Sequence, residues 1–196
     1  MSGYTIRNMR SDEINTIAAM IADGYKNDIF FHWVVDNPAD HQQVVCDYYK
    51  VYLNAAGCVA HVAEAPDGTR MGATVWLPDD VDPSIYDEID RVTGKYAPQF
   101  RAVADASHES EPDERPFYQL VGFVVDPALR GKGIGAALLK HQLDILDKKG
   151  VPTYLEASTP FHGGGVYGKF GYERVGELLT FSDTAVLWPL WRGVKK

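Results

Sequence analysis

The sequence of 196 residues has few cysteines, no cationic cluster and no long apolar run. Its two cysteines, Cys46 and Cys58, are too few for a disulfide framework or a four-cysteine zinc site. No stretch approaches the roughly 20 apolar residues of a membrane-spanning helix, and the first residues lack the apolar run of a signal peptide. We therefore expect a cytoplasmic protein without a membrane partner.

Positive charge is also scarce. The chain has 19 Lys and Arg against 27 Asp and Glu, which gives a formal net charge of −8 at pH 7. Nucleic acid is not an expected partner, because phosphate-backbone binding needs clustered lysine and arginine. Negative charge suits a cationic substrate, although a solvated acidic surface is the alternative. The six histidines are scattered, with no pair four residues apart, so we expect no metal.

Hydrophobic residues make up 45% of the chain and charged residues 23%, which is typical of a globular protein and excludes global disorder. A domain usually has about 100–200 residues, so we expect residues 1–196 to form a single domain. The pattern favours an α+β fold in which helices cover a twisted mixed sheet. Strands are predicted at residues 4–7, 58–64, 71–77, 117–125, 153–157, 172–178 and 181–191, and helices from Ser11 to Ile21 and at residues 40–54, 132–149 and 166–170.

Two segments are less regular. Residues 25–36 crowd five aromatic or histidine side chains together and are predicted to form a buried turn or the wall of an aromatic pocket. Residues 79–115 are polar and helical in character, with breakers at Pro83, Gly94 and Pro98.

Three alternate glycines, Gly131, Gly133 and Gly135, lie where the most strand-like segment is followed by the best helix. Glycine lets the backbone approach a ligand closely, and the first amides of a helix have no partner within the helix. Arg130 and Lys132 add positive charge. The pattern predicts an anion site, with a pyrophosphate as the natural ligand. A turn that only requires glycine is the alternative.

Two other phosphate-binding motifs fit this loop less well. Gly131-x-Gly133-x-x-Ala136 matches the dinucleotide fingerprint, and Glu156 imitates its ribose-binding acid. However, residues 126–130 separate the strand from the first glycine, where the fingerprint has a tight turn. Only about 60 residues follow Ala136, too few for the rest of a doubly wound sheet. No Gly-Lys-Ser/Thr closes the loop, which excludes a Walker motif.

The loop resembles the acetyl-CoA pyrophosphate loop of the GNAT superfamily of acyl-CoA N-acyltransferases, whose pattern is Arg/Gln-x-x-Gly-x-Gly/Ala. The resemblance extends to Val125-Asp126-Pro127 and to residues 166–172, which are similar to the family's F-Y-x-x-x-G-F signature, and covers roughly residues 4–190. Residues 75–81 and 150–159 and the acidic, proline-rich insertion are similar to puromycin N-acetyltransferase-like members. The resemblance implies the GNAT fold, with a central sheet of about six to seven strands flanked by helices.

The resemblance also implies acetyl-CoA as the co-substrate. The residues implied to hold it are Phe123, Val124, Val125, Arg130, Gly131, Lys132, Gly133, Ile134, Gly135 and Ala136. Independently, Gly122 interrupts a β-branched and aromatic strand, which predicts a bulge, with an ordinary strand glycine as the alternative. A bulge there would splay this strand from residues 153–157 and expose backbone groups that pair with the amide-bearing pantetheine arm.

Acetyl transfer to an amine needs a group that stabilises an oxyanion, an acid for the leaving thiolate and a base. The Val125 N–H is the candidate for the first role. Tyr167 matches the position of the family's general acid, and a core tyrosine is the alternative. Glu156 and Glu64 are the candidate bases, because each lies near the end of a predicted strand. Glu156 acting only as a structural hydrogen-bonding group is the alternative for that residue.

The loop before Tyr167 departs from the family pattern, which has Arg-Asn there. Residues 160–166 are one residue longer and contain no Asn. His162 is either a substitute for that Asn or a solvated loop residue. Cys58 and His61 are not expected to form a thiol–imidazole pair, because their odd spacing in a strand sends them to opposite faces.

We therefore predict an acetyl-CoA-dependent N-acetyltransferase that acts directly on a primary amine of a small molecule. The alternative is an acyl-CoA-binding module or sensor without turnover, which would tolerate the loss of Tyr167. Residues 25–37 and 79–110 are expected to form the acceptor pocket, with Phe31 and Trp33 contacting the substrate. Both a monomer and a homodimer are compatible with the sequence.

Overall fold

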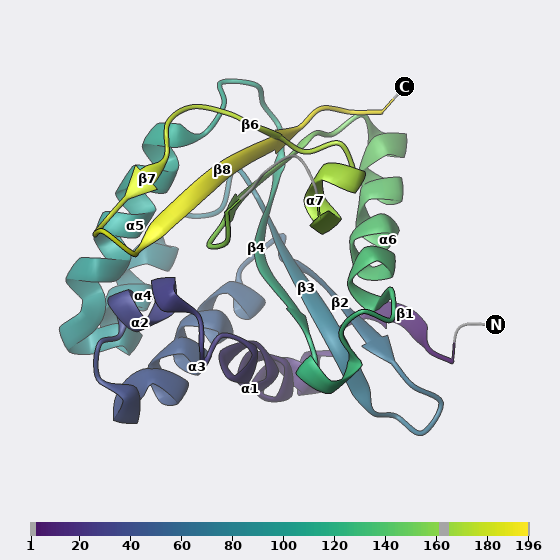
Figure 1. Ribbon diagram of the computed structural model, residues 1–196, viewed down its shortest axis with the longest axis horizontal. Coiled ribbons are helices and arrows are strands. Elements are labelled where there is room, and N and C mark those ends of the chain that lie inside the picture. Colours follow the sequence, from purple (N-terminus) through teal and green to yellow (C-terminus); the bar gives the residue numbers. More distant parts are fainter. Residues whose placement is uncertain (1–2, 161–164, 196) are drawn as a thin grey trace.

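The structure is a computed structural model and describes residues 3–160 and 165–195. Within these residues, eight strands form one twisted sheet in the order β1-β2-β3-β4-β5-β8-β6, and β7 pairs with β8 (Figure 1). The strands are β1 (Thr5–Asn8), β2 (Val59–Glu64), β3 (Arg70–Pro78), β4 (Tyr118–Val125), β5 (Thr153–Ala157), β6 (Glu173–Arg174), β7 (Leu179–Thr180) and β8 (Val186–Arg192). This confirms the predicted α+β class with a mixed sheet, which has one strand more than expected.

The extra strand comes from the C-terminal part of the chain. The strand predicted at residues 172–178 is wrong in extent, because only β6 (Glu173–Arg174) lies in that range; β7 follows at Leu179–Thr180, and both strands pair with β8. Gly176, with φ +60, lies between them and turns the backbone where a continuous strand was expected.

Helices cover both faces of the sheet. The helices α1 to α5 share one hydrophobic core on one face, and α6 packs on the opposite face beside α7 (Figure 1). Three short 3-10 segments, η1 (Ser11–Glu13), η2 (Gly94–Tyr96) and η3 (Pro127–Leu129), accompany them. The α-helices are α1 (Ile14–Gly24), α2 (Ile29–Val34), α3 (Pro38–Asn54), α4 (Ser84–Thr93), α5 (Ala97–Ser110), α6 (Ile134–Lys149) and α7 (Gly165–Lys169). None of the helices in the described part of the chain has the length and apolar character needed to span a membrane.

The aromatic segment at residues 25–36 contains the short helix α2, which the sequence pattern did not predict. Asp28 explains its start, because its Oδ1 accepts hydrogen bonds from the Phe30 and Phe31 N–H groups at 2.9 and 3.3 Å. The helix turns Phe30 and Phe31 inward, so the expectation of an aromatic pocket wall is confirmed.

The carboxylate of Glu13, which lies at the predicted start of the first helix, stabilises the N-terminal segment. The Glu13 side chain is 3% exposed and binds the Arg7 guanidinium with two hydrogen bonds of 2.7 Å. It also accepts hydrogen bonds from Arg70 at 3.0 and 3.1 Å. Glu13 therefore connects η1 to β1 and β3.

The bulge that Gly122 predicts is present in β4. Val75 pairs with Gly122 and Trp76 pairs with Leu120, so Val121 is the extra residue. A Cβ at Gly122 would lie 3.0 Å from Tyr49 Cε1. Beyond the bulge β4 diverges from β5, because their parallel pairing is confined to Tyr118–Thr153 and Gln119–Tyr154. The predicted splay of these two strands is therefore confirmed.

Candidate active site

Backbone groups of β4 point into the gap between β4 and β5. The Asp126 N–H donates to the Met71 carbonyl at 3.0 Å, so residue 126 faces β3. Because neighbouring residues of a strand alternate in the direction of their hydrogen bonds, Val125 and Phe123 face the gap. The Val125 carbonyl there accepts a hydrogen bond from Arg130 Nε at 3.3 Å. The Val125 N–H, the predicted oxyanion donor, therefore points into this gap.

The same alternation excludes Val124 as a coenzyme-binding residue. Its backbone groups face β3, where it pairs with Ala73, and its side chain is 4% exposed and packs against Gly24. The assignment of Val124 was wrong, because it treated three consecutive strand residues as equivalent although only alternate ones face the gap.

The predicted glycine loop leads into the first turn of α6. Gly131 and Gly133 have φ values of +78 and +81, and a Cβ at either position would meet nothing within 4 Å, so the space beside them is open. The Ala137 N–H donates to the Gly133 carbonyl at 3.0 Å. The amides of residues 134–136 precede this bond and have no partner within the helix. The loop therefore offers open backbone amides at the positive end of a sixteen-residue helix.

Two residues of this loop differ from the expectation in detail. Ile134 is 1% exposed, so only its backbone is available to a ligand. Gly135 was expected to allow a ligand to approach, but a Cβ there would lie 2.9 Å from Phe123 Cζ. Gly135 is therefore required for the packing of α6 against β4.

A cavity of about 320 Å³ lies at the splay, and we call it the splay cavity. Residues of β4, β5 and α7 and of the segment after α1 line it. They are Gly24, Tyr25, Asn27, Asp28, Phe123, Arg130, Glu156, Ala157, Ser158, Thr159 and Tyr167. The cavity thus brings the predicted residues Phe123, Arg130, Glu156 and Tyr167 together.

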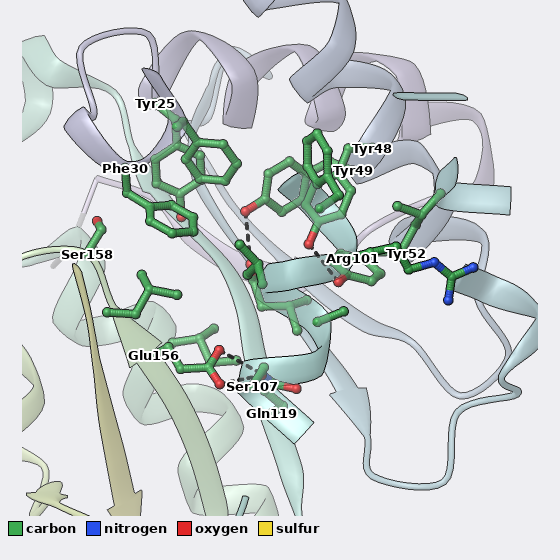
Figure 2. Close-up of a pocket in the computed structure, with 18 of the residues that line it drawn as sticks. Tyr25, Phe30, Tyr48, Tyr49, Tyr52, Arg101, Ser107, Gln119, Glu156 and Ser158 are labelled. Atoms are coloured by element: carbon green, nitrogen blue, oxygen red, sulfur yellow. Dashed lines mark hydrogen bonds between the residues drawn. The ribbon is translucent and has the colours of Figure 1, made fainter. Parts of the chain in front are cut away.

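A second cavity, of about 130 Å³, lies among α2, α3, α4 and α5, and we call it the aromatic cavity. It is lined by both segments that the sequence assigned to the acceptor pocket, and it shares Tyr25, Glu156 and Ser158 with the splay cavity (Figure 2). Phe31, a predicted substrate contact, lines this cavity. Trp33 does not; its ring lies against Phe181 at 5.1 Å between centroids, because α2 turns it away.

Glu156 of β5 lies at the junction of the cavities, where its hydrogen-bond partners are neutral side chains. Ser107 of α5 donates a hydrogen bond to its Oε1, and Gln119 of β4 donates to its Oε2 at 3.1 Å (Figure 2). Burial raises the pKa of Glu156 above its usual value, and the negative charge of Glu111 adds to this effect. Among the described residues, Glu156 forms no ion pair with a lysine, arginine or histidine.

Tyr167 lies in α7 on the wall of the splay cavity. Its ring is 6.1 Å from that of Phe123 and 5.9 Å from that of Tyr172, measured between centroids. Burial raises the pKa of Tyr167, so its hydroxyl stays protonated near neutral pH. His162, the alternative proton source in the lengthened loop, lies outside the described residues.

Other candidate groups lie away from both cavities. Glu64 pairs with Arg7 and Arg10 beside β1, and hydrogen bonding from Arg7 lowers its pKa, so its assignment as a base was wrong. Cys58 packs on the core under α1 to α5, whereas the His61 ring lies 4.7 Å from that of His141 in α6. The two residues therefore form no catalytic pair, as expected.

Five residues that line the cavities were not singled out by the sequence, although the first three lie in the segments assigned to the acceptor pocket: Tyr25, Asp28, Ser107, Gln119 and Ser158. The hydroxyl of Tyr25 contacts the Phe123 backbone, and Ser158 Oγ donates to Asp28 Oδ2 at 2.7 Å. Tyr25 stood out only as one member of an aromatic cluster, and the two serines and Gln119 carried no signal in the sequence.

This architecture, a sheet splayed beside a glycine-rich helix start, is shared with solved structures of N-acetyltransferases. Residues 85–172 match the model of the acetyltransferase (GNAT) family, and the matched stretch includes the glycine loop, Glu156 and Tyr167. No curated protein matches the chain.

Solved structures agree with this fold. A structure described as histone acetyltransferase HPA2 and related acetyltransferase, from Corynebacterium glutamicum, has 18% identity and a TM-score of 0.72 over 99% of this chain and 98% of its own. Arylalkylamine N-acetyltransferase 2 from Aedes aegypti has 13% identity and a TM-score of 0.63, covering 99% and 100% of the two chains. An agmatine N-acetyltransferase has 14% identity and a TM-score of 0.61, covering 98% and 100%.

Proposed function

We propose that the protein transfers the acetyl group of acetyl-CoA directly to a primary amine of a small molecule. The junction of the two cavities at Glu156 carries this proposal. A donor bound at the splay and an acceptor bound among the aromatic side chains meet at one carboxylate, that of Glu156. Two structural neighbours are named for arylalkylamines and for agmatine, which are primary amines, and this supports the acceptor class. The likeness of residues 75–81 and 150–159 to puromycin N-acetyltransferase-like proteins also supports a small-molecule amine as the acceptor.

The residues of the splay fit acetyl-CoA. Its pyrophosphate is an anion, and the amides of residues 131–136 with Arg130 and Lys132 form a positive site at a helix start. Its pantetheine arm carries amide groups, which suit the backbone edge of β4 that faces the gap. Acetyl-CoA supplies the activated acetyl group, and the side chains of this chain supply the proton transfers.

We assign the base to Glu156 and the acid to Tyr167. Glu156 takes one proton from the ammonium and later releases it to water. The neutral nitrogen then forms a bond to the carbonyl carbon while the carbon–sulfur bond breaks. Tyr167 gives its proton to the departing sulfur and regains one from the nitrogen as the amide forms. The Val125 N–H donates to the carbonyl oxygen while that oxygen carries negative charge.

A panel of amines incubated with the protein and acetyl-CoA tests the proposal. Release of free thiol, detected with dithionitrobenzoate, together with an acetylated product in mass spectrometry, is the expected result. Tight binding of coenzyme A with no acetylated amine would favour the acyl-CoA-binding alternative. Saturable binding of NAD in place of coenzyme A would overturn both hypotheses.

A further inference from the structure

Glu156 faces the aromatic cavity as a carboxylate whose partners are neutral. Ser107 and Gln119 satisfy one lone pair on each oxygen, but neither carries a charge. Burying a carboxylate without a cation costs free energy that a cationic ligand offsets. Glu111, the other carboxylate lining this cavity, is bound by Arg115 at 2.8 Å. Glu156 is therefore the carboxylate of this cavity that is open to a ligand ammonium.

Three of the tyrosines that line the cavity, Tyr25, Tyr48 and Tyr49, present ring faces to a ligand because their hydroxyls are already bonded. Tyr49 donates to the Val121 carbonyl at 3.0 Å, and Tyr48 donates to the Tyr52 hydroxyl at 2.6 Å. Tyr25 is bonded to the Phe123 backbone. Ring faces pack well against an aromatic ligand and attract cations. The cavity thus suits an apolar ring attached to a positive head.

The volume and the far end of the aromatic cavity further restrict the kind of ligand that it can hold. Its volume is about 130 Å³, and an apolar cavity of about 150 Å³ holds one benzene ring. Arg101 lies at the opposite end from Ser158 (Figure 2), where it pairs with Asp90 at 2.8 Å and with Asp87 at 3.2 Å. The aspartates at this end are already paired with Arg101, and Glu111 is paired with Arg115. The described residues that line this end therefore offer no free carboxylate to a second positive group on the ligand, which disfavours diamines and agmatine-like dications.

We propose that the acceptor is a monocationic arylalkylamine with a single aromatic ring. The ring occupies the aromatic cavity, and the ammonium binds Glu156. Because Glu156 also lines the splay cavity, the nitrogen then faces the acetyl donor. This inference rests on the proposed function.

Calorimetry of wild-type protein in the presence of coenzyme A tests the inference without requiring turnover. We expect 2-phenylethylamine to bind at least about tenfold more tightly than agmatine or 2-(1-naphthyl)ethylamine. Glu156→Gln should weaken 2-phenylethylamine by a similar factor and leave the uncharged 2-phenylethanol within about twofold. Equal or tighter binding of agmatine would overturn the inference, as would an unchanged affinity of Glu156→Gln for 2-phenylethylamine.

Two variants of α4 test the location of the ring. Ile89 lines the aromatic cavity, whereas Val92 lines a separate surface groove between α3 and α4. Ile89→Phe should abolish 2-phenylethylamine binding, and Val92→Phe should retain it. Retained binding by a folded Ile89→Phe would overturn the placement of the ring in the aromatic cavity. If Ile89→Phe fails to fold, the affinity of Glu156→Gln for 2-phenylethylamine decides whether the amine binds at this cavity. Acetylation of agmatine but not of 2-phenylethylamine would overturn this inference alone, whereas absence of coenzyme A binding would overturn the proposed function.

Discussion

The Tyr25 hydroxyl replaces a strand partner for Phe123. It accepts a hydrogen bond from the Phe123 N–H at 3.1 Å and donates one to the Phe123 carbonyl at 3.2 Å. Both backbone groups face the gap where β5 has diverged, so without this hydroxyl they would lack a protein partner on that side. One side chain from the end of α1 thus stabilises the open edge of β4 between the two cavities.

Tyr25→Phe should therefore destabilise the protein although it keeps the ring. Two partly buried backbone groups lose their partner, which costs about 1–3 kcal/mol of unfolding free energy. Urea denaturation measures the change. Tyr86→Phe is the matched control, because it also removes a hydroxyl from a tyrosine lining the aromatic cavity, and it should stay within about 0.5 kcal/mol. Equal stability of Tyr25→Phe and Tyr86→Phe would contradict the role given to Tyr25.

Local chemistry made much of the site predictable. Gly122 indicated the bulge because a glycine within a β-branched strand is typical of a bulge or of a close backbone approach, and the bulge implied the splay. The glycines at 131 and 133 indicated the start of α6, because both need a positive φ that other residues avoid.

The remaining features depend on contacts between distant segments. Ser107 reaches Glu156 because α5 packs beside β5, and no local pattern encodes that contact. Val124 was misassigned since the direction of a strand's hydrogen bonds depends on its register with β3. The buried side of α6 likewise depends on distant partners: Leu139 and Leu143 are buried against β5 and β8, while His141 and Ile145 are half-buried.

Lys132→Gln should weaken coenzyme A binding about fivefold. Lys132 is exposed at the loop, and among the described residues it forms no ion pair, so its charge is available to an anion. One such charge in water contributes about 1 kcal/mol, and the effect should shrink as salt is raised. Lys140→Gln, further along α6 and paired with Asp144 at 2.6 Å, should leave the affinity within about twofold. Calorimetry at low and high salt checks this; equal losses in both variants would contradict binding at the loop.

Glu13 should make stability depend on acid pH. Hydrogen bonding from Arg7 lowers the pKa of Glu13 from 4.5 to about 2. A lowered pKa contributes stability that is present above pH 4.5 and lost as the pH falls toward 2. Glu13→Gln should therefore cost about 1–3 kcal/mol near neutral pH, and less in acid. Glu88→Gln, which removes an exposed partner of Arg91, should cost under about 1 kcal/mol. Urea denaturation near neutral pH and in acid tests this prediction. A loss of stability in Glu13→Gln that is as large in acid as near neutral pH would contradict it.

Glu156 should set the acid limb of the pH–rate profile. A base acts only when it is ionised, and burial raises the pKa of Glu156 above 4.5. We therefore expect kcat/KM for an accepted amine to rise with pH through a value above 4.5. Glu156→Gln should lower kcat/KM about 10²–10⁴-fold and remove this limb. Steady-state kinetics across the acid range measures both effects, and an unchanged limb in Glu156→Gln would assign the base to another group.

Tyr167→Phe should lower kcat about 10²–10⁴-fold, because the variant keeps the ring beside Phe123 and loses the proton donor. Affinity for acetyl-CoA should change little, since the hydroxyl acts on the departing sulfur. Tyr172→Phe is the control: that hydroxyl accepts a hydrogen bond from Thr153 at 2.8 Å in the core, so its loss should lower stability and leave kcat within about threefold. Activity of Tyr167→Phe within error of wild type would refute the assignment and direct attention to His162. A fall in kcat equal in both variants would indicate that Tyr167 acts through packing, because both rings belong to the same cluster.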